Sequence, residues 1–440
     1  MPYLRNAIYA LLLLIVSPYL ALRAWRDGKY RQGWAQKLWG RVPRRLGNQP
    51  CVWLHAVSVG EVKLLRPLIE QIERKRPDWE IRISTTTSTG MQLALNEYPE
   101  HVIFYAPLDF SWAVRRAVAR VRPTALVLAE LELWPNLIQA AAEHGARVAI
   151  INGRLSEHSF KGYLKIRWAL ASTMRRIDLV AAQSDTYASR FRALGIGPGR
   201  LRVTGSIKYD GVESDRSNTR TLALRRALGI SASDVVFVAG STMEGEEQAA
   251  LDAYRAARAV HHRLRLIVVP RHKERFDAVA RLLEAAGDPI SRRSLLEDIR
   301  GERAVSNSIC LIDTIGELSA VWGLADIAFV GGSLFPGRGG QNMMEPAAYG
   351  AALLFGMHTH NFDDAVEGLL SCGGARRVAD PGELATALLT DLDDPEAANE
   401  RAIAGREFVL AQHGAASRTF SELERLVGAT VPMSLVGSRG

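Results

Sequence analysis

The feature that most constrains this fold is an alternation of short apolar runs with helical stretches, which occurs in two blocks along the chain. The runs are Cys51–Ala56, Glu80–Ser84, Ala125–Ala129, Val148–Ile151 and Leu179–Ala182, then Val235–Ala239, Leu264–Val269, Ser308–Ile312, Ile327–Val330 and Ala352–Phe355. Runs this short and apolar are typical of parallel strands that are buried on both faces. Their alternation with helices predicts an α/β chain of two Rossmann-like domains that face a cleft.

The length of 440 residues also indicates two domains, because single hydrophobic cores seldom grow beyond about 250–300 residues. The polar segment Gly211–Arg220 is the predicted linker. We therefore expect a first domain at 47–212 and a second at 213–425, preceded by a separate N-terminal segment at 1–46.

The positive charge of the chain is concentrated at its N-terminus. Residues 1–45 contain nine Lys or Arg and one acid, Asp27, and so carry the whole net charge of +8, while the other 46 basic and 46 acidic residues cancel. A nucleic-acid-binding protein would spread such an excess over a docking face, so we predict no nucleic-acid partner. Basic residues beside an apolar segment favour anionic lipid headgroups as the partner.

That apolar segment, Ala7–Ala24, is close to the roughly 17–20 residues with which a helix crosses a bilayer. Basic residues follow it, which predicts a single-pass anchor with the bulk of the chain on the cytoplasmic side. Four aromatic residues between 25 and 39 interleave with the charges, as expected at headgroup level. A cleaved signal peptide is an alternative, although only Arg5 precedes the apolar run, and Pro18 leaves room for a buried or interfacial helix.

Neither a metal site nor a disulfide framework is predicted. The cysteines are odd in number and far apart (Cys51, Cys310 and Cys372), which indicates reduced thiols in a cytosolic compartment. His358 and His360 have no third ligand nearby, and the acidic stretch Asp391–Asp394 lies away from the predicted strand ends. We expect no metal and no other cofactor.

Glu61 follows the first apolar run, at the start of a helix that Ser58 could cap. Because ligands of open α/β sheets bind at the carboxyl ends of the strands, Glu61 would lie in the cleft. The helix dipole favours its charged form, and an ionised carboxylate can accept a proton from an attacking hydroxyl. The alternative is a glutamate that only completes a capping box.

Three further groups follow strands of the first block. Glu130 and Glu132 would point to the same side of a continued strand, as ligand-binding carboxylates or as solvated edge charges. Lys208 could counter negative charge on a ligand, or it could be an ordinary surface lysine. The hydroxyl-rich segment Ser84–Gly90 suits an anionic or sugar ligand, and equally a plain helix cap.

The second block carries a predicted phosphate site. Arg271 follows a strand and could form a phosphate fork. The glycines of Gly337–Pro346 expose backbone amides, and Glu345 could reach ribose hydroxyls. A structural glycine loop is the alternative.

Five separated motifs together resemble those of the 3-deoxy-D-manno-octulosonic acid (Kdo) transferases. They are His55–Glu61, Glu130–Asn136, Gly205–Lys208, Pro270–His272 and Gly339–Pro346, and the resemblance runs from the N-terminal anchor to about Asp364. It implies a GT-B fold and an inverting, metal-independent glycosyltransferase of lipopolysaccharide core biosynthesis. It also implies CMP-Kdo as donor, the lipid A precursor lipid IVA as acceptor, and a place on the cytoplasmic side of the bacterial inner membrane.

The resemblance also assigns roles to residues. It makes the first domain the acceptor-binding domain and the second the CMP-Kdo-binding domain. Glu61 would be the catalytic base, and Glu130 and Lys208 would assist the transition state. The residues that would line the CMP site are Pro270, Arg271, Gly316, Glu317, Leu318, Asn342, Met343, Met344 and Glu345. One departure is local, because Leu131 stands where the family has threonine.

Two rival functions are considered. The first is another GT-B enzyme, such as a nucleotide-sugar 2-epimerase or a different lipid glycosyltransferase, but an epimerase acts on a soluble substrate and needs no anchor. The second is a membrane-bound nucleotide-binding module without catalysis, which would have no use for a base at Glu61.

Overall fold

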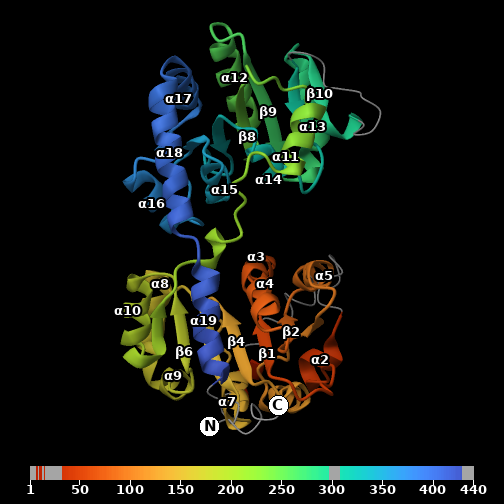
Figure 1. Cartoon of the computed structure of the whole chain (residues 1–440), viewed down its shortest axis with the longest axis vertical. Coiled ribbons are helices and arrows are strands. Elements are labelled where there is room, and N and C mark those ends of the chain that lie inside the picture. Colours follow the sequence, from red (N-terminus) through yellow and green to blue (C-terminus); the bar gives the residue numbers. More distant parts are fainter. Residues whose placement is uncertain (1–5, 8, 12–13, 15–31, 297–307, 429–440) are drawn as a thin grey trace, which may run out of the picture. The chain divides into compact units, whose positions relative to one another are not determined.

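The computed structural model describes residues 6–7, 9–11, 14, 32–296 and 308–428, and the chain divides into two compact units. The first unit comprises the chain up to Gly211 and again from His413 onward, and the second spans Val212–Gln412. Each unit has one parallel sheet with helices on both faces (Figure 1).

The sheet of the first unit has seven strands in the order β3-β2-β1-β4-β5-β6-β7. The strands are β1 (Cys51–His55), β2 (Glu80–Thr85), β3 (Val102–Tyr105), β4 (Ala125–Ala129), β5 (Arg147–Gly153), β6 (Leu179–Ala182) and β7 (Leu201–Val203). The strand order reverses between β1 and β4, which is where ligands bind in doubly wound sheets.

Helices cover both faces of this sheet because each strand has apolar side chains on both sides. Trp53 and Leu126 belong to one buried cluster, whereas Leu54 and Val127 belong to the other. The helices are α2 (Trp34–Trp39), α3 (Val59–Leu64), α4 (Arg66–Lys75), α5 (Ser88–Glu97), α6 (Ser111–Val121), α7 (Pro135–Glu143), α8 (Glu157–Lys165), α9 (Arg167–Met174), α10 (Asp185–Ala193) and α19 (Ala415–Gly428). Short 3₁₀ turns η1 (Pro198–Arg200) and η2 (Ile207–Tyr209) flank β7.

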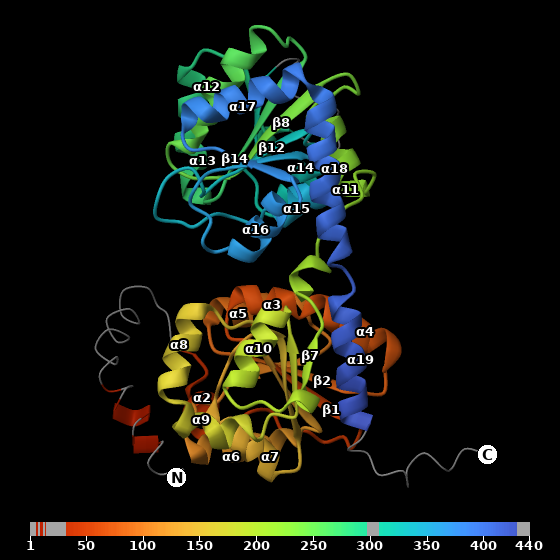
Figure 2. The same ribbon diagram turned by 90° about the vertical axis from the view of Figure 1, so that its left-hand side faces the viewer.

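The last helix corrects a predicted boundary. The predicted second domain includes 413–425, but α19 belongs to the first unit. Phe420 and Leu423 are buried in the same cluster as Leu54, and α19 lies beside α4 (Figure 2). Asp210 fixes the return of the chain, because its carboxylate accepts the amide hydrogens of Gly414 (2.5 Å) and Ala416.

The sheet of the second unit also has seven parallel strands, in the order β10-β11-β9-β8-β12-β13-β14. The strands are β8 (Val235–Thr242), β9 (Leu264–Pro270), β10 (Ile290–Arg292), β11 (Ile309–Leu311), β12 (Ile327–Val330), β13 (Ala352–Phe355) and β14 (Ala375–Arg377). The helices are α11 (Thr219–Ala227), α12 (Glu246–Arg258), α13 (Phe276–Ala285), α14 (Leu318–Trp322), α15 (Met344–Ala348), α16 (Asp363–Ser371), α17 (Pro381–Asp393) and α18 (Pro395–Ala411), with 3₁₀ turns η3 (Lys273–Arg275) and η4 (Arg293–Leu295).

All ten predicted strands are present, and the four that were missed are the edge strands of the two sheets: β3, β7, β10 and β14. Each has only three or four residues, and each has residues that are not fully buried. Edge strands need no continuous apolar run because solvent reaches them, so the pattern used for prediction is absent from them.

Most of the predicted membrane span at 7–24 lies outside the described residues. Within the ranges that are described, the structure has no helix with the length and apolar character needed to cross a bilayer.

Candidate active site

Glu61 lies at the carboxyl end of β1, in the first turn of α3, and is 9% exposed. Its two oxygens accept hydrogen bonds from the amide of Val57 and the hydroxyl of Ser58, both at 2.8 Å. The Ser58 hydroxyl in turn caps α3 by accepting the Glu61 amide hydrogen at 3.3 Å. Ser58 and Glu61 therefore do form the capping box. The same hydrogen bonds hold the Glu61 carboxylate in one orientation.

Burial raises the pKa of Glu61 above its ordinary value, and the charge of Glu130 adds to the rise, although the Val57 and Ser58 hydrogen bonds oppose it. This direction is opposite to the one expected from the helix dipole alone. A carboxylate with a raised pKa is a stronger base, which suits proton abstraction from a hydroxyl.

Glu130 and Lys208 are brought together although 78 positions separate them in the sequence. Lys208 Nζ lies 2.7 Å from Glu130 Oε1, and both side chains are partly exposed. Glu130 has a left-handed backbone (φ 56°), which is rare for a non-glycine residue and often marks a functional site. Lys208 is positioned by η2, whose first amide is bound by the buried side chain of Asn152 at 3.0 Å.

Glu132 is a member of this site that the predicted site residues left out. Burial raises its pKa to about 7, and the charges of Glu61 and Glu130 contribute to the rise. Trp134 donates its indole hydrogen to Glu132 Oε2 at 2.9 Å, and Trp134 makes an edge-to-face contact with His55 at 5.6 Å. Three carboxylates therefore share this edge of the sheet, and the paired acids at 130 and 132 were the sequence signal that indicated it.

The hydroxyl-rich segment after β2 has a structural role in this molecule. The hydroxyls of Thr85, Thr86 and Thr87 each donate to the carbonyl of Val57, at 3.2–3.4 Å. Thr87 also caps α5 by accepting the Gly90 amide hydrogen. These contacts steady the residue whose amide binds Glu61, so the segment supports the site indirectly.

The predicted donor residues all follow the carboxyl ends of strands in the second unit. Pro270 ends β9 and Arg271 is exposed directly after it, while Gly316–Leu318 follow β11, the neighbour of β9. Asn342–Glu345 end the loop after β12, where Asn342 Nδ2 donates to Glu345 Oε1 at 2.9 Å. Glu317 pairs with Arg293 at 3.0 Å. These residues thus lie at the same end of the sheet, where the strands have their carboxyl ends.

Glu246 holds the loop after β12, and the predicted site residues did not include it. Its carboxylate is fully buried and accepts four backbone amide hydrogens, from Met243, Gly332, Ser333 and Leu334, at 2.7–3.0 Å. These amides are at the point where the strand order reverses between β8 and β12. Glu246 therefore fixes the loop from within, and a phosphate would have to use other amides of the glycine-rich segment.

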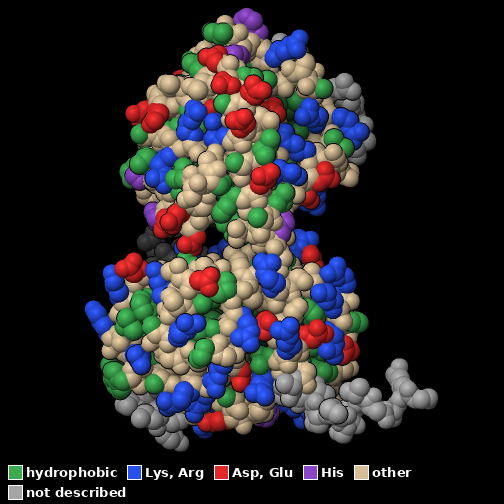
Figure 3. Space-filling view, turned by 60° about the vertical axis from the view of Figure 1, so that its left-hand side comes forward, with side chains coloured by type: hydrophobic (Ala, Val, Ile, Leu, Met, Phe, Trp, Pro, Cys, Tyr) green, Lys and Arg blue, Asp and Glu red, His purple; other side chains and the backbone are tan. Residues whose placement is uncertain are grey.

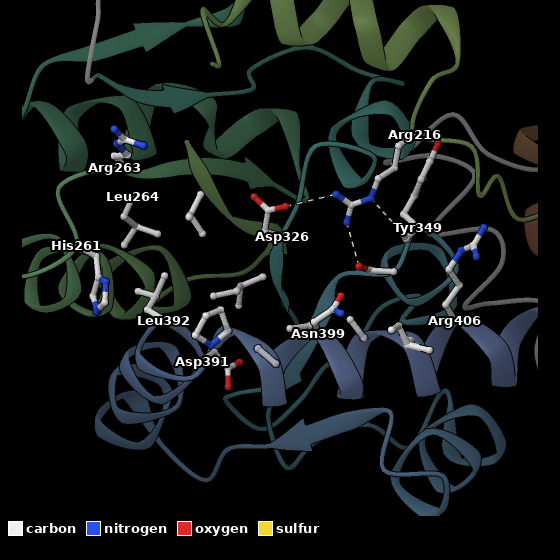
Figure 4. A pocket seen from close by; sticks show the side chains of 18 of the residues that line it. Arg216, His261, Arg263, Leu264, Asp326, Tyr349, Asp391, Leu392, Asn399 and Arg406 are labelled. Carbon is white, nitrogen blue, oxygen red and sulfur yellow. Dashed lines mark hydrogen bonds and ion pairs between the residues drawn. The ribbon is translucent and has the colours of Figure 1, made fainter. Parts of the chain in front are cut away.

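A cavity of about 1050 Å³ lies at the opposite end of this sheet, where the strands begin (Figure 4). The first residues of β8, β9, β12 and β13 line it, together with parts of α17 and α18. None of the predicted donor residues is among its lining. Asp391 of the acidic stretch is buried beside it, between Arg376 at 3.3 Å and Arg401 at 2.5 Å, which is a structural arrangement.

Comparison with known proteins places these features in a family. The family described as "3-Deoxy-D-manno-octulosonic-acid transferase (kdotransferase)" matches residues 31–211. The 3-deoxy-D-manno-octulosonic acid transferase of Haemophilus influenzae is 34% identical over 429 residues, which cover 94% of this chain and 97% of that protein. The enzyme of the same name from Bordetella pertussis is 32% identical over 439 residues, covering 96% of this chain and all of that protein.

Solved structures match the fold at lower identity. UDP-GlcNAc 2-epimerase from Neisseria meningitidis superposes with a TM-score of 0.57 at 11% identity, over 85% of this chain and all of that one. A glycosyltransferase from Rickettsia africae matches with a TM-score of 0.57 at 13% identity, over 87% of this chain and 99% of that one. These likenesses agree with the GT-B arrangement of two Rossmann-like sheets and say nothing about substrate. On the strength of its full-length relatives, the chain belongs to the 3-deoxy-D-manno-octulosonic acid transferase family.

Proposed function

We propose that this protein transfers Kdo from CMP-Kdo to lipid IVA, with inversion and without a metal ion, in lipopolysaccharide core biosynthesis. The observation that carries the proposal is the arrangement of Glu61, which is buried, hydrogen-bonded on both oxygens and followed along the same edge by the Glu130–Lys208 pair. In a coupled assay, CMP release should depend on added lipid acceptor. Turnover of the nucleotide sugar without lipid would favour the epimerase alternative.

In the proposed reaction, Glu61 takes the proton of the acceptor hydroxyl as the oxygen attacks the anomeric carbon. The bond from that carbon to the CMP phosphate breaks, and CMP leaves with the electron pair. The anomeric centre becomes cation-like, as in other glycosyl transfers, so nearby carboxylates stabilise it electrostatically. The Lys208 ammonium pairs with Glu130 at 2.7 Å, which holds the two side chains together at the site.

The donor would be bound through the residues at the carboxyl edge of the second sheet. Arg271 is exposed, and its backbone is anchored because its amide donates to the carbonyl of Thr242 at 3.0 Å. Its guanidinium is therefore available for the CMP phosphate, which an arginine binds through two parallel hydrogen bonds.

Replacing this arginine should weaken donor binding. We expect Arg271→Ala to raise the Kd for CMP about tenfold or more, because a charge-assisted hydrogen bond contributes roughly 1.5–3 kcal/mol. Arg281→Ala, an exposed arginine on α13, is the matched control. Calorimetric titration with CMP measures both, and an unchanged Kd for Arg271→Ala would remove this residue from the phosphate site.

The acceptor is proposed to remain in an anionic inner membrane, to which the N-terminal segment tethers the enzyme on its cytoplasmic side. The junction of α8 and α9 supports this proposal. Leu164, Ile166 and Trp168 are 39%, 46% and 83% exposed there, and they alternate with the exposed cations Lys165 and Arg167. Apolar and basic side chains that alternate on a surface are typical of lipid contact. Figure 3 shows hydrophobic and basic side chains side by side on the left of the first unit.

This α8–α9 junction is connected to the carboxylates. Tyr163, one residue before Leu164, packs on the core cluster that also contacts Leu131 and Trp134. Burial raises the pKa of the Tyr163 phenol, and the charge of Glu132 adds to the rise. A lipid whose chains stay at the junction would therefore have its head group near the proposed base.

Replacing Leu164, Ile166 and Trp168 together by serine should impair use of the membrane-borne acceptor. We expect KM for lipid IVA in anionic vesicles to rise about tenfold with kcat little changed, because apolar burial contributes about 25 cal/mol per Å². Val260→Ser and Leu222→Ser, exposed apolar residues of the second unit, are the controls. An unaltered KM would show that the junction does not contact lipid.

A further inference from the structure

The cavity at the amino ends of β8, β9, β12 and β13 has no part in the proposed reaction, yet its volume of about 1050 Å³ suits a sizeable ligand. Its floor is apolar and buried, formed by the first residues of three strands and by one face of α18 (Leu264, Ile327, Ala352, Ala398 and Ala402). Part of its wall is the segment Ser214–Ser217, just after the chain enters the second unit.

Most charged groups that line the cavity are already paired. Arg216 donates to the carbonyls of Ala325, Tyr349 and Gly350 at 2.5–3.0 Å, and it lies 3.4 Å from Asp326. The second oxygen of Asp326 accepts the Val236 amide hydrogen at 2.9 Å. These bonds attach the linker to the sheet and neutralise Asp326.

His261 and Asp391 are paired as well. His261 Nε2 lies 2.9 Å from Asp393, and Asp391 lies between Arg376 and Arg401. The remaining acid is Asp215, whose carboxylate accepts the amide hydrogen of Ser217 at 2.8 Å.

Of the three arginines that line the cavity, Arg263 and Arg406 have no carboxylate partner among the described residues. Arg406 Nε donates to the carbonyl of Ala348 at 3.2 Å, which orients the guanidinium and leaves its Nη groups for a ligand. Figure 4 shows Arg263 and Arg406 on opposite sides of the cavity, with Asp326 and Asn399 between them. The arrangement offers an oriented cation at one end of an apolar floor.

The shape of the floor indicates an elongated ligand. Arg406, Ala402, Ala398 and Pro395 follow one another along α18 at spacings of three or four residues, so they lie on one side of the helix. At 1.5 Å per residue this line is roughly 16 Å long, and Leu392 continues it. We propose that the cavity binds a single acyl chain with an anionic head, the head at Arg406 and the chain along α18.

Such a ligand would contact both segments through which the chain passes between its units. Ser214–Ser217 follow the first crossing at Gly211, and α18 ends at Ala411, just before the second crossing at Gln412. A ligand that binds one conformation of these segments better than another shifts the balance between conformations. We therefore assign the cavity as an effector site, a part of the inference that rests on the proposed function.

The test uses the full chain in nanodiscs of zwitterionic lipid, with octyl phosphate as the probe and with the signal of empty nanodiscs subtracted. Octyl phosphate should bind saturably to the wild type, at least tenfold more tightly than to Arg406→Gln. Asn399→Trp, which places a bulky ring over the floor from an exposed position, should abolish binding. Arg263→Gln, at the far end, should change affinity less than Arg406→Gln does.

Two probes separate the head from the chain. Inorganic phosphate should bind far more weakly than octyl phosphate, and 1-octanol should not distinguish the wild type from Arg406→Gln. Equal binding of octyl phosphate to the wild type, Arg406→Gln and Asn399→Trp would overturn the site. Binding does not require turnover, so Glu61→Ala should retain it even if the proposed reaction is wrong. Saturating octyl phosphate should change kcat at least twofold in the wild type and not in Arg406→Gln, and binding with no change in kcat would contradict the effector role.

Discussion

Glu61→Ala is expected to lower the rate of Kdo transfer by about 10²- to 10⁴-fold, the range that general-base catalysis contributes. The affinity for CMP should remain within twofold, because Glu61 belongs to the first unit and Arg271 to the second. Glu61→Gln should be nearly as inactive, since its one amide oxygen can accept the hydrogen bond of either Val57 or Ser58 but cannot take a proton. Rates and CMP affinity are measured on the same preparations.

The pH dependence of the wild type gives an independent measure of the same group. The base must be ionised, so kcat/KM should fall as the pH is lowered through the pKa of Glu61. Because burial raises that pKa, the fall should begin at a higher pH than an exposed glutamate would give. The residual activity of Glu61→Gln should lack this fall. Glu100→Ala, which replaces an exposed glutamate of the same unit, is the control. If Glu61→Ala transfers Kdo at a rate within tenfold of the wild type, Glu61 is not the base.

Glu246→Ala should cause the largest loss of stability of any single substitution considered. The carboxylate accepts four amide hydrogens, and those of Gly332, Ser333 and Leu334 are buried. An unsatisfied buried donor costs about 1–3 kcal/mol, so we expect the free energy of unfolding of the second unit to fall by about 4 kcal/mol or more. Denaturant titration followed by circular dichroism measures the change.

Two further variants, Glu246→Gln and Glu244→Ala, test whether the loss of stability comes from the acceptor oxygens of Glu246. The glutamine retains one acceptor oxygen and should be destabilised by less than the alanine variant. Glu244 is exposed two residues away, so Glu244→Ala should leave the unfolding midpoint nearly unchanged. If Glu246→Ala unfolds at the wild-type denaturant concentration, the carboxylate does not hold the loop after β12.

The central strands could be predicted because strands that are buried on both faces consist almost entirely of apolar residues. Ile327–Val330 is fully buried between two helical layers and therefore had to be an unbroken apolar run. Ala375–Arg377 is equally a strand, yet two of its three residues are arginines that are only partly buried at an edge. This segment is a strand because it pairs with β13, and that pairing cannot be predicted from the local sequence.

The site could be predicted in part for a similar reason. Glu130 follows an apolar run directly and Glu61 stands five positions after another, and neighbouring parallel strands bring such positions to the same end of the sheet. The Glu130–Lys208 contact depends on the left-handed backbone at Glu130 and on the placement of η2, which involve residues far apart in sequence. The loop-holding role of Glu246 likewise depends on contacts with partners such as Gly332, which stands 86 positions later in the sequence.

The predicted domain boundary at the C-terminus was wrong because α19 looks like any amphipathic helix in the sequence. Its apolar residues, among them Phe420 and Leu423, fit either unit equally well on periodicity alone. The contacts that decide its place, from Asp210 to the amides of Gly414 and Ala416, join positions about 200 residues apart.

Attachment of Kdo to a lipid increases the mass of that lipid, and this increase can be measured. The full-length protein is incubated with CMP-Kdo and lipid IVA, and the lipid fraction is weighed by mass spectrometry. We expect lipid IVA to gain the mass of one or more Kdo residues while CMP is released. If CMP-Kdo is consumed and the lipid keeps its original mass, the proposed acceptor reaction is contradicted.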